Sequence, residues 1–152
     1  MKKTCIALLL VSTLFIIGCN KKAELTSLQR RQLEARDLQG NYENAYKATL
    51  EVLQDYGYVI ENTDHASGVI HGKTGVKSDS GGKMSWLEAT ATIEQFGDDI
   101  VKERLSLLKK EKTSSGGGRI REKSESVEDP EFFAKIFDDI QKEIFIRQNI
   151  NK

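Results

Sequence analysis

The chain has 152 residues, and its 23 lysine and arginine side chains are balanced by 23 aspartate and glutamate side chains. This balance argues against a nucleic-acid-binding protein, in which basic residues are in excess. A chain of this length suits one small domain, and its two cysteines leave little scope for a disulfide framework.

Residues 1–18 have the organisation of a secretory signal peptide. Two lysines follow Met1, an almost unbroken apolar run extends from Ile6 to Ile17, and the small residue Gly18 precedes the expected cut. The apolar run is shorter than the about 20 residues that a membrane-spanning helix needs, so an uncut transmembrane helix is less favoured. The other alternative is a soluble secreted protein with a chance cysteine after the cleavage site.

The motif Ile16-Ile17-Gly18-Cys19 resembles the lipobox of bacterial lipoproteins. This resemblance implies attachment of diacylglycerol to the Cys19 thiol, cleavage before Cys19, and acylation of the new amino group by a fatty acid such as palmitate. The lipid bilayer would then be a partner, because two or more acyl chains hold a protein stably at a membrane. Asn20 stands where an aspartate would favour inner-membrane retention, so the outer membrane, facing the periplasm, is expected if the cell is Gram-negative.

Residues 19–39 are predicted to form a polar tether between this anchor and a single domain over residues 40–150. The leucines of the tether are too sparse for a core-facing helix, although Arg31–Leu38 could form either an edge strand or a frayed helix. Loss of the signal removes Cys5 and lipidation occupies Cys19. The domain is therefore expected to be held together by its apolar core without a disulfide.

An amphipathic helix is predicted directly after the tether. Asn41 is a suitable N-cap and Gly57 suits the residue after the helix. Apolar residues recur between them at steps of three and four, as in a helix with one buried face. These residues are Tyr42, Ala45, Tyr46, Thr49, Leu50, Val52, Leu53 and Tyr56.

The middle of the chain is predicted to form antiparallel strands. Tyr58–Asn62 and Val69–Thr74 flank turn-forming residues and read as a hairpin, followed by a flexible loop over Gly75–Lys83. Trp86–Phe96 alternates apolar and polar residues, as in a sheet covered on one side, and Ile100–Lys110 is the fourth strand. The inward-facing side chains are predicted to be Leu87, Ala89, Ala91, Ile93, Val101, Leu105 and Leu107.

A second amphipathic helix is predicted to begin at Pro130, after the N-cap Asp129, and to run to about Arg147. Before it, Arg119–Val127 could pair as a highly charged edge strand or remain coil. The apolar stripe of the helix needs a partner, and the dry face of the sheet is the available one. This stripe consists of Phe133, Ile136, Phe137, Ile140 and Ile144.

These elements predict an α+β fold: an antiparallel sheet of four, possibly five, strands with an N-terminal and a C-terminal helix packed on one face. Over Ala48–Ile70 the order of helix, Gly57-Tyr58, strand, turn and Gly68-Val69-Ile70 resembles the helix-grip-like domains of small envelope lipoproteins. One example is the lipoprotein C subunit of the outer-membrane barrel-assembly machine. The resemblance implies a fold and no activity.

No catalytic, cofactor-binding or metal-binding residues are predicted. His65 and His71 could approach each other across the hairpin, with Asp64 beside them, but two surface histidines in and beside a turn are the favoured interpretation. The glycines at Gly116–Gly118 lack the strand and helix that flank a phosphate loop. The adjacent carboxylates Asp98-Asp99 point apart in regular structure, so they do not suggest an acid–base pair.

Trp86 is a tentative partner contact, because it shares the polar side of its strand and could anchor another protein. The sequence therefore favours a non-catalytic interaction or assembly module of the cell envelope, which binds another envelope protein and no nucleic acid. The alternative is a small ligand-binding or hydrolytic lipoprotein with a cleft between helices and sheet. That cleft would be excluded if Phe133, Phe137 and Leu53 filled the helix–sheet interface.

Overall fold

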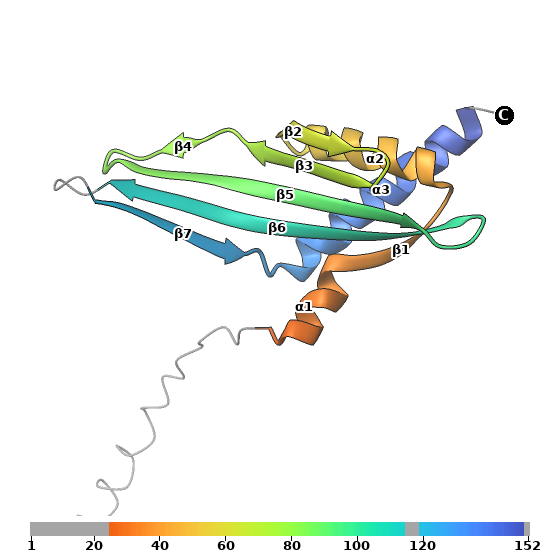
Figure 1. Cartoon of the computed structure of the whole chain (residues 1–152), viewed down its shortest axis with the longest axis horizontal. Helices are drawn as coiled ribbons and strands as arrows, with labels where there is room; N and C mark the ends of the chain where they lie inside the picture. Colours follow the sequence, from red (N-terminus) through yellow and green to blue (C-terminus); the bar gives the residue numbers. More distant parts are fainter. Residues whose placement is uncertain (1–24, 115–118, 151–152) are drawn as a thin grey trace, which may run out of the picture.

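The computed structural model describes residues 25–114 and 119–150. The predicted signal peptide, the lipobox and Cys19 lie outside the described residues. Figure 1 shows one antiparallel sheet with helices α2 and α3 side by side against one of its faces. The predicted α+β class is therefore confirmed, although the sheet has more strands than expected and a third helix is present.

Within the described ranges the sheet contains seven strands, in the order β1-β6-β5-β3-β2, with β4 paired to β5 and β7 paired to β6. None of the helices in the described part of the chain is long and apolar enough to cross a membrane. In chain order the elements are α1 (Ser27–Glu34), β1 (Ala35–Gln39), α2 (Tyr42–Asp55), β2 (Tyr58–Asp64), β3 (Val69–Thr74), β4 (Lys77–Ser78), β5 (Lys83–Gln95), β6 (Ile100–Ser114), β7 (Ile120–Ser126) and α3 (Pro130–Ile150).

Within the described residues, regular structure is present before residue 40, in the segment predicted as a tether. Thr26 caps α1 in a reciprocal capping box with Gln29, and β1 pairs with β6 along its whole length. Arg31–Leu38 was predicted to form either an edge strand or a frayed helix. It contains the end of α1 and the start of β1. β1 is held by main-chain hydrogen bonds to β6, and Leu38 is its only residue buried in the core. The apolar pattern of the sequence therefore did not predict this strand.

The helix and hairpin predicted after this boundary are confirmed. The Asn41 side-chain oxygen Oδ1 accepts a hydrogen bond from the Asn44 amide at 2.9 Å, which caps α2. Gly57 follows the helix with a φ of 83°, a conformation that favours glycine. β2 then pairs with β3 through the predicted turn.

Strands β5 and β6 are longer than predicted, and with β4 and β7 they extend beyond the helices as an arm (Figure 1). The loop predicted over Gly75–Lys83 is wrong in part, because β4 pairs with β5 inside it. Arg119–Val127 contains a strand, β7.

The arm formed by β4, β7 and the adjoining parts of β5 and β6 carries ion pairs where the helices do not cover the sheet. The Glu111 carboxylate lies 2.9 Å from the ammonium groups of both Lys83 and Lys109. Hydrogen bonds from Lys109 and Lys83 lower the pKa of the Glu111 carboxyl to about 2.

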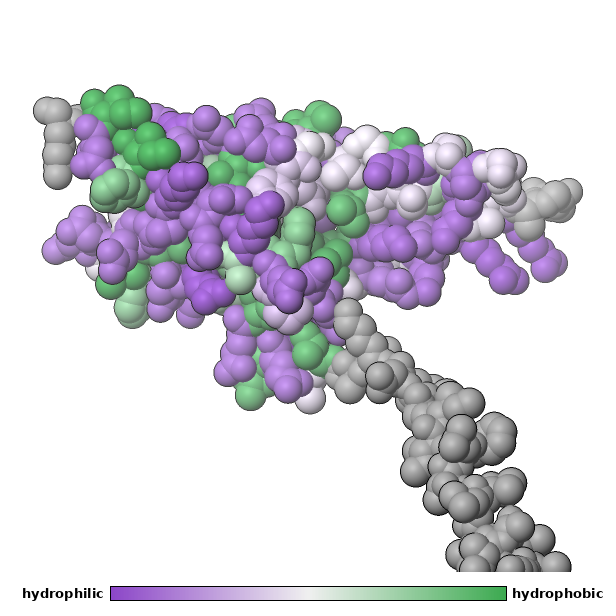
Figure 2. Space-filling model, turned by 180° about the vertical axis from the view of Figure 1, so that it is seen from behind, coloured by the Kyte–Doolittle hydropathy of each residue, from purple (hydrophilic) through white to green (hydrophobic). Residues whose placement is uncertain are grey.

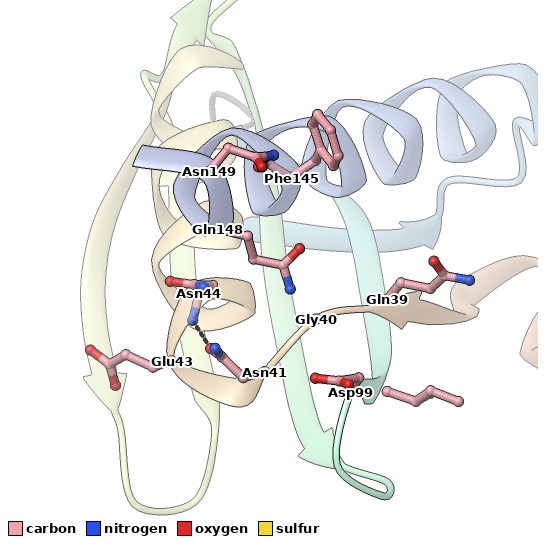
Figure 3. Close-up of a pocket in the computed structure, with 10 residues that line it drawn as sticks. Gln39, Gly40, Asn41, Glu43, Asn44, Asp99, Phe145, Gln148 and Asn149 are labelled. Atoms are coloured by element: carbon pink, nitrogen blue, oxygen red, sulfur yellow. Dashed lines mark hydrogen bonds between the residues drawn. The ribbon is translucent and has the colours of Figure 1, made fainter. Parts of the chain in front are cut away.

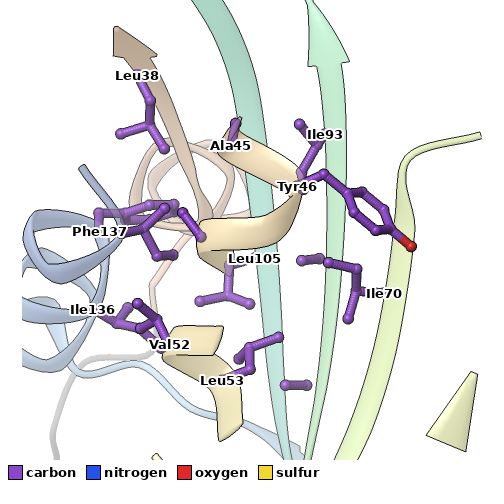
Figure 4. Packing of buried hydrophobic residues seen from close by; sticks show 14 of the residues in the cluster. Leu38, Ala45, Tyr46, Val52, Leu53, Ile70, Ile93, Leu105, Ile136 and Phe137 are labelled. Atoms are coloured by element: carbon purple, nitrogen blue, oxygen red, sulfur yellow. The ribbon is translucent and has the colours of Figure 1, made fainter. Parts of the chain in front are cut away.

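Helix α3 has the predicted N-cap, since the Asp129 carboxylate accepts hydrogen bonds from the Glu131 and Phe132 amides at 3.1 and 3.2 Å. It extends to Ile150, further than expected. The whole predicted apolar stripe is buried, and Figure 4 shows two of its residues, Ile136 and Phe137, facing α2 and the sheet. Phe133, Phe137 and Leu53 are completely or almost completely buried, so these three side chains fill the helix–sheet interface between the described elements.

Candidate functional site

A surface groove of about 760 Å³ lies where β1 passes into α2, beside the last turns of α3 (Figure 3). We call it the end groove. Its walls come from the β1–α2 junction, the turn between β5 and β6, and α3, which are far apart in the sequence. The lining residues are Gln39, Gly40, Asn41, Glu43, Asn44, Asp99, Ile100, Phe145, Gln148 and Asn149.

Gly40 allows these segments to meet. Its amide donates a hydrogen bond to the Asp99 main-chain oxygen at 2.8 Å, which joins the β1–α2 junction to the β5–β6 turn. Its φ is 153°, and a Cβ atom at this position would lie 2.4 Å from Cγ2 of Ile144. A larger residue would therefore push α3 away from the groove.

Two glutamines fix the segments further. Gln141 of α3 accepts a hydrogen bond from the Gln39 amide at 2.8 Å and donates one to the Gln39 main-chain oxygen at 3.0 Å. Gln95 accepts a hydrogen bond from the first amide of α2, that of Tyr42, at 2.7 Å, and it donates one to the Gly97 oxygen at 2.6 Å. The shape of the end groove thus depends on polar contacts between distant segments.

Large apolar side chains are exposed in and around this groove. Phe145 is 64% exposed, Ile100 is 42% exposed and the neighbouring Phe96 is 68% exposed. Seen from behind, hydrophobic residues gather near the end of α3 (Figure 2). The same groove is lined by residues with side-chain amides, so it combines apolar and polar contacts, as protein-contact surfaces do.

Glu43 and Asp99 are the carboxylates of the groove. The pKa of Glu43 is lowered because Lys47 and His65 hydrogen-bond to its carboxylate. The ring of His65 also packs edge-on against Tyr46, with centroids 4.7 Å apart. An acid held ionised by such partners supplies binding charge and has no proton to donate at neutral pH.

The sequence-predicted candidates lie elsewhere. His71 bonds through Nδ1 to the Thr90 hydroxyl at 3.0 Å, whereas His65 lies beside α2, so each histidine has its own partners. Among the described residues there is no group of three or more histidine, cysteine or acidic side chains that could hold a metal ion. Asp64 accepts hydrogen bonds from the Ala66 and Ser67 amides and stabilises the hairpin turn.

Trp86 is half-buried on β5 within the arm, and it does not line the end groove. Its indole N–H donates a hydrogen bond to the Glu88 carboxylate at 2.9 Å. It lines a different surface groove of about 670 Å³ near Tyr56 and Leu87. Its role as a partner contact stays a prediction.

Glu103 is a buried acid that the sequence reasoning missed. It occupies the inward row of β6 between Val101 and Leu105, and its side chain is completely buried. Burial raises the pKa of Glu103 to about 8, opposed by the hydrogen bond with Thr49 at 3.0 Å. The Thr49 hydroxyl also donates to the Ala45 oxygen at 2.8 Å, so a protonated Glu103 completes the chain of hydrogen bonds. Buried and exposed residues alternate along the first part of β6, so the position of Glu103 between Val101 and Leu105 could have predicted that its side chain faces the core.

Comparison with known proteins adds a likeness in fold. No family model matches the chain, and no curated protein matches it. Among solved structures, the chain is similar to a DUF4468 family protein from Bacteroides ovatus ATCC 8483. The identity is 12% and the TM-score is 0.37, over 72% of this chain and 84% of that chain. At these values we draw no conclusion from the likeness about the site or its function.

Proposed function

We propose that the protein is a membrane-anchored envelope lipoprotein that acts as a non-catalytic interaction module and docks a partner protein at the end groove. The anchor rests on the lipobox-like motif that ends at Cys19. The observation that carries the docking role is the exposure of Phe145 on α3 and of Ile100 at the start of β6, which both line the end groove, together with the exposed Phe96 in the adjoining β5–β6 turn. Exposed apolar surface of this kind marks interaction sites.

The position of α1 supports a groove that a partner can reach. The six residue steps from Cys19 to Leu25 span at most about 20 Å, so lipidation would hold the start of α1 close to the bilayer. The Leu25 amide donates to the Glu128 carboxylate at 3.2 Å, directly before α3. The end groove uses the other end of that helix, and the helix rises by about 22 Å between Pro130 and Phe145. The groove therefore lies away from the anchor.

Anchoring and docking are tested separately. For anchoring, membrane fractionation and palmitate labelling, with and without globomycin, compare the wild type with Cys19→Ser. The wild type should be labelled and sediment with membranes, whereas the variant should be neither. An unmodified N-terminus in protein from the native host would refute the anchor.

For docking, a photo-crosslinking amino acid replaces Phe145 in living cells, with Lys123 on the arm as the control position. We expect a crosslinked envelope protein from position 145 and none from position 123, and its yield should fall in the Ile100→Ser background. Equal crosslinking from both positions, or none from a fully lipidated protein, would contradict the docking role.

A further inference from the structure

The charges of the end groove indicate what kind of segment it accepts. Glu43 is already bonded to Lys47 and His65. In the described part of the chain, the carboxylate of Asp99 has no hydrogen-bond or ion-pair partner, and it is exposed. Asp98 precedes it in the same turn. An unpaired carboxylate beside exposed apolar side chains favours a cationic partner over an anionic one.

The helix ends at the groove also favour a cationic partner over an anionic one. The last turns of α3 bring main-chain oxygens with partial negative charge to the edge of the groove, of which that of Phe145 already accepts a hydrogen bond from the Asn149 side chain. Arg147, the basic residue of that end, is engaged in ion pairs with Glu51 and Glu143. Two of the amides at the start of α2 that could attract an anion are already bonded, since Gln95 accepts from the Tyr42 amide and the Asn41 side chain accepts from the Asn44 amide.

The remaining walls suit an extended main chain. Side-chain amides at Gln39, Asn44 and Gln148 can each donate and accept hydrogen bonds, as a peptide backbone requires, whereas the Asn149 amide already donates to the Phe145 main-chain oxygen at 2.8 Å. Phe145 offers both an apolar surface and an aromatic face, and an aromatic face attracts arginine and lysine.

We propose that the end groove binds an extended segment of a partner protein in which arginine or lysine stands next to an apolar side chain. In this arrangement the cation lies against the Asp99 carboxylate, the apolar side chain contacts Phe145 and Ile100, and the amide side chains bond to the main chain of the segment. This inference rests on the proposed function and specifies the partner that the groove selects.

The test uses the mature chain from residue 19 onward with Cys19→Ser and a short fluorescein-labelled peptide that alternates arginine and leucine. Fluorescence anisotropy compares it with a peptide in which glutamate replaces arginine and one in which serine replaces leucine. We expect at least about tenfold weaker binding for both replacements, because each removes one half of the recognition. Equal affinity for the glutamate peptide would overturn the inference.

Variants of the chain locate the contact. Asp99→Asn should weaken binding of the arginine peptide by about tenfold, as the loss of one charge-assisted bond does. Phe145→Ser should weaken it as well. Asp138→Asn, on the exposed face of α3, is the matched control and should bind like the wild type. The inference fails if the Asp99 and Asp138 variants behave alike.

The cellular crosslink separates this inference from the proposed function. A crosslink at position 145 that persists undiminished in the Asp99→Asn background would overturn the cationic segment while leaving docking intact. A lipidated protein with no crosslink would refute docking itself.

Discussion

Replacing the buried acid Glu103 with glutamine tests the energetic cost of placing a carboxyl in the core. The native pKa of Glu103 is about 8, against an ordinary value of 4.5 in the unfolded chain, because burial disfavours the charged form. Between these two values the native protein keeps a proton that the unfolded chain has released. Stability therefore falls as pH rises from 4.5 to 8 and changes no further above that range.

The size of this effect follows from the same values. At about 1.4 kcal/mol per pH unit, Glu103 costs the native state about 4 kcal/mol between pH 5 and pH 9. Glu103→Gln does not titrate, and its amide can still donate to the Thr49 hydroxyl. The variant should therefore lack this loss and be the more stable protein at pH 9.

Urea unfolding at a series of pH values measures the effect. The informative quantity is the difference between wild type and variant, since other groups titrate equally in both. Glu94→Gln, at an exposed position of the neighbouring strand, is the control and should keep the wild-type dependence. If Glu103→Gln lost stability between pH 5 and pH 9 as steeply as the wild type, the assignment of a buried, protonated acid would be refuted.

Other substitutions probe the core and the framework of the groove. Phe137→Ala should lower the free energy of unfolding by about 3–5 kcal/mol, because the ring is buried, whereas Phe145→Ala, at an exposed position, should change it little; urea titration compares them. Gly40→Ala should cost about 1–3 kcal/mol in thermal unfolding and abolish peptide binding, since the added methyl group displaces α3. Tyr56→Phe should cost about 1–2 kcal/mol, because its hydroxyl donates to the Asp139 carboxylate at 2.7 Å; an equally destabilised Asp139→Asn with no further loss in the double variant would confirm the pair.

The amphipathic elements could be predicted because burial on one side imposes a period on the sequence. α2 and α3 place an apolar residue every third or fourth position, and the inward row of β5 alternates strictly, so the one-sided sheet with helices on its dry face followed directly. The helix caps Asn41 and Asp129 could also be predicted from the sequence, because a cap is a hydrogen bond between residues close in the chain. The lipid anchor is a prediction of the same local kind.

Tertiary structure decided what local pattern could not express. Strands β1, β4 and β7 exist because main-chain groups of longer strands hold them, and main-chain pairing is nearly independent of side-chain type. Side chains alternate between the two faces of β6, so the pairing of this strand turns the Glu103 side chain into the core although it is polar. The end groove depends on Gly40, on Gln141, which bonds across 102 residues of sequence, and on Gln95, which bonds across 53. Only the folded chain therefore brings Asp99 and Phe145 to one groove.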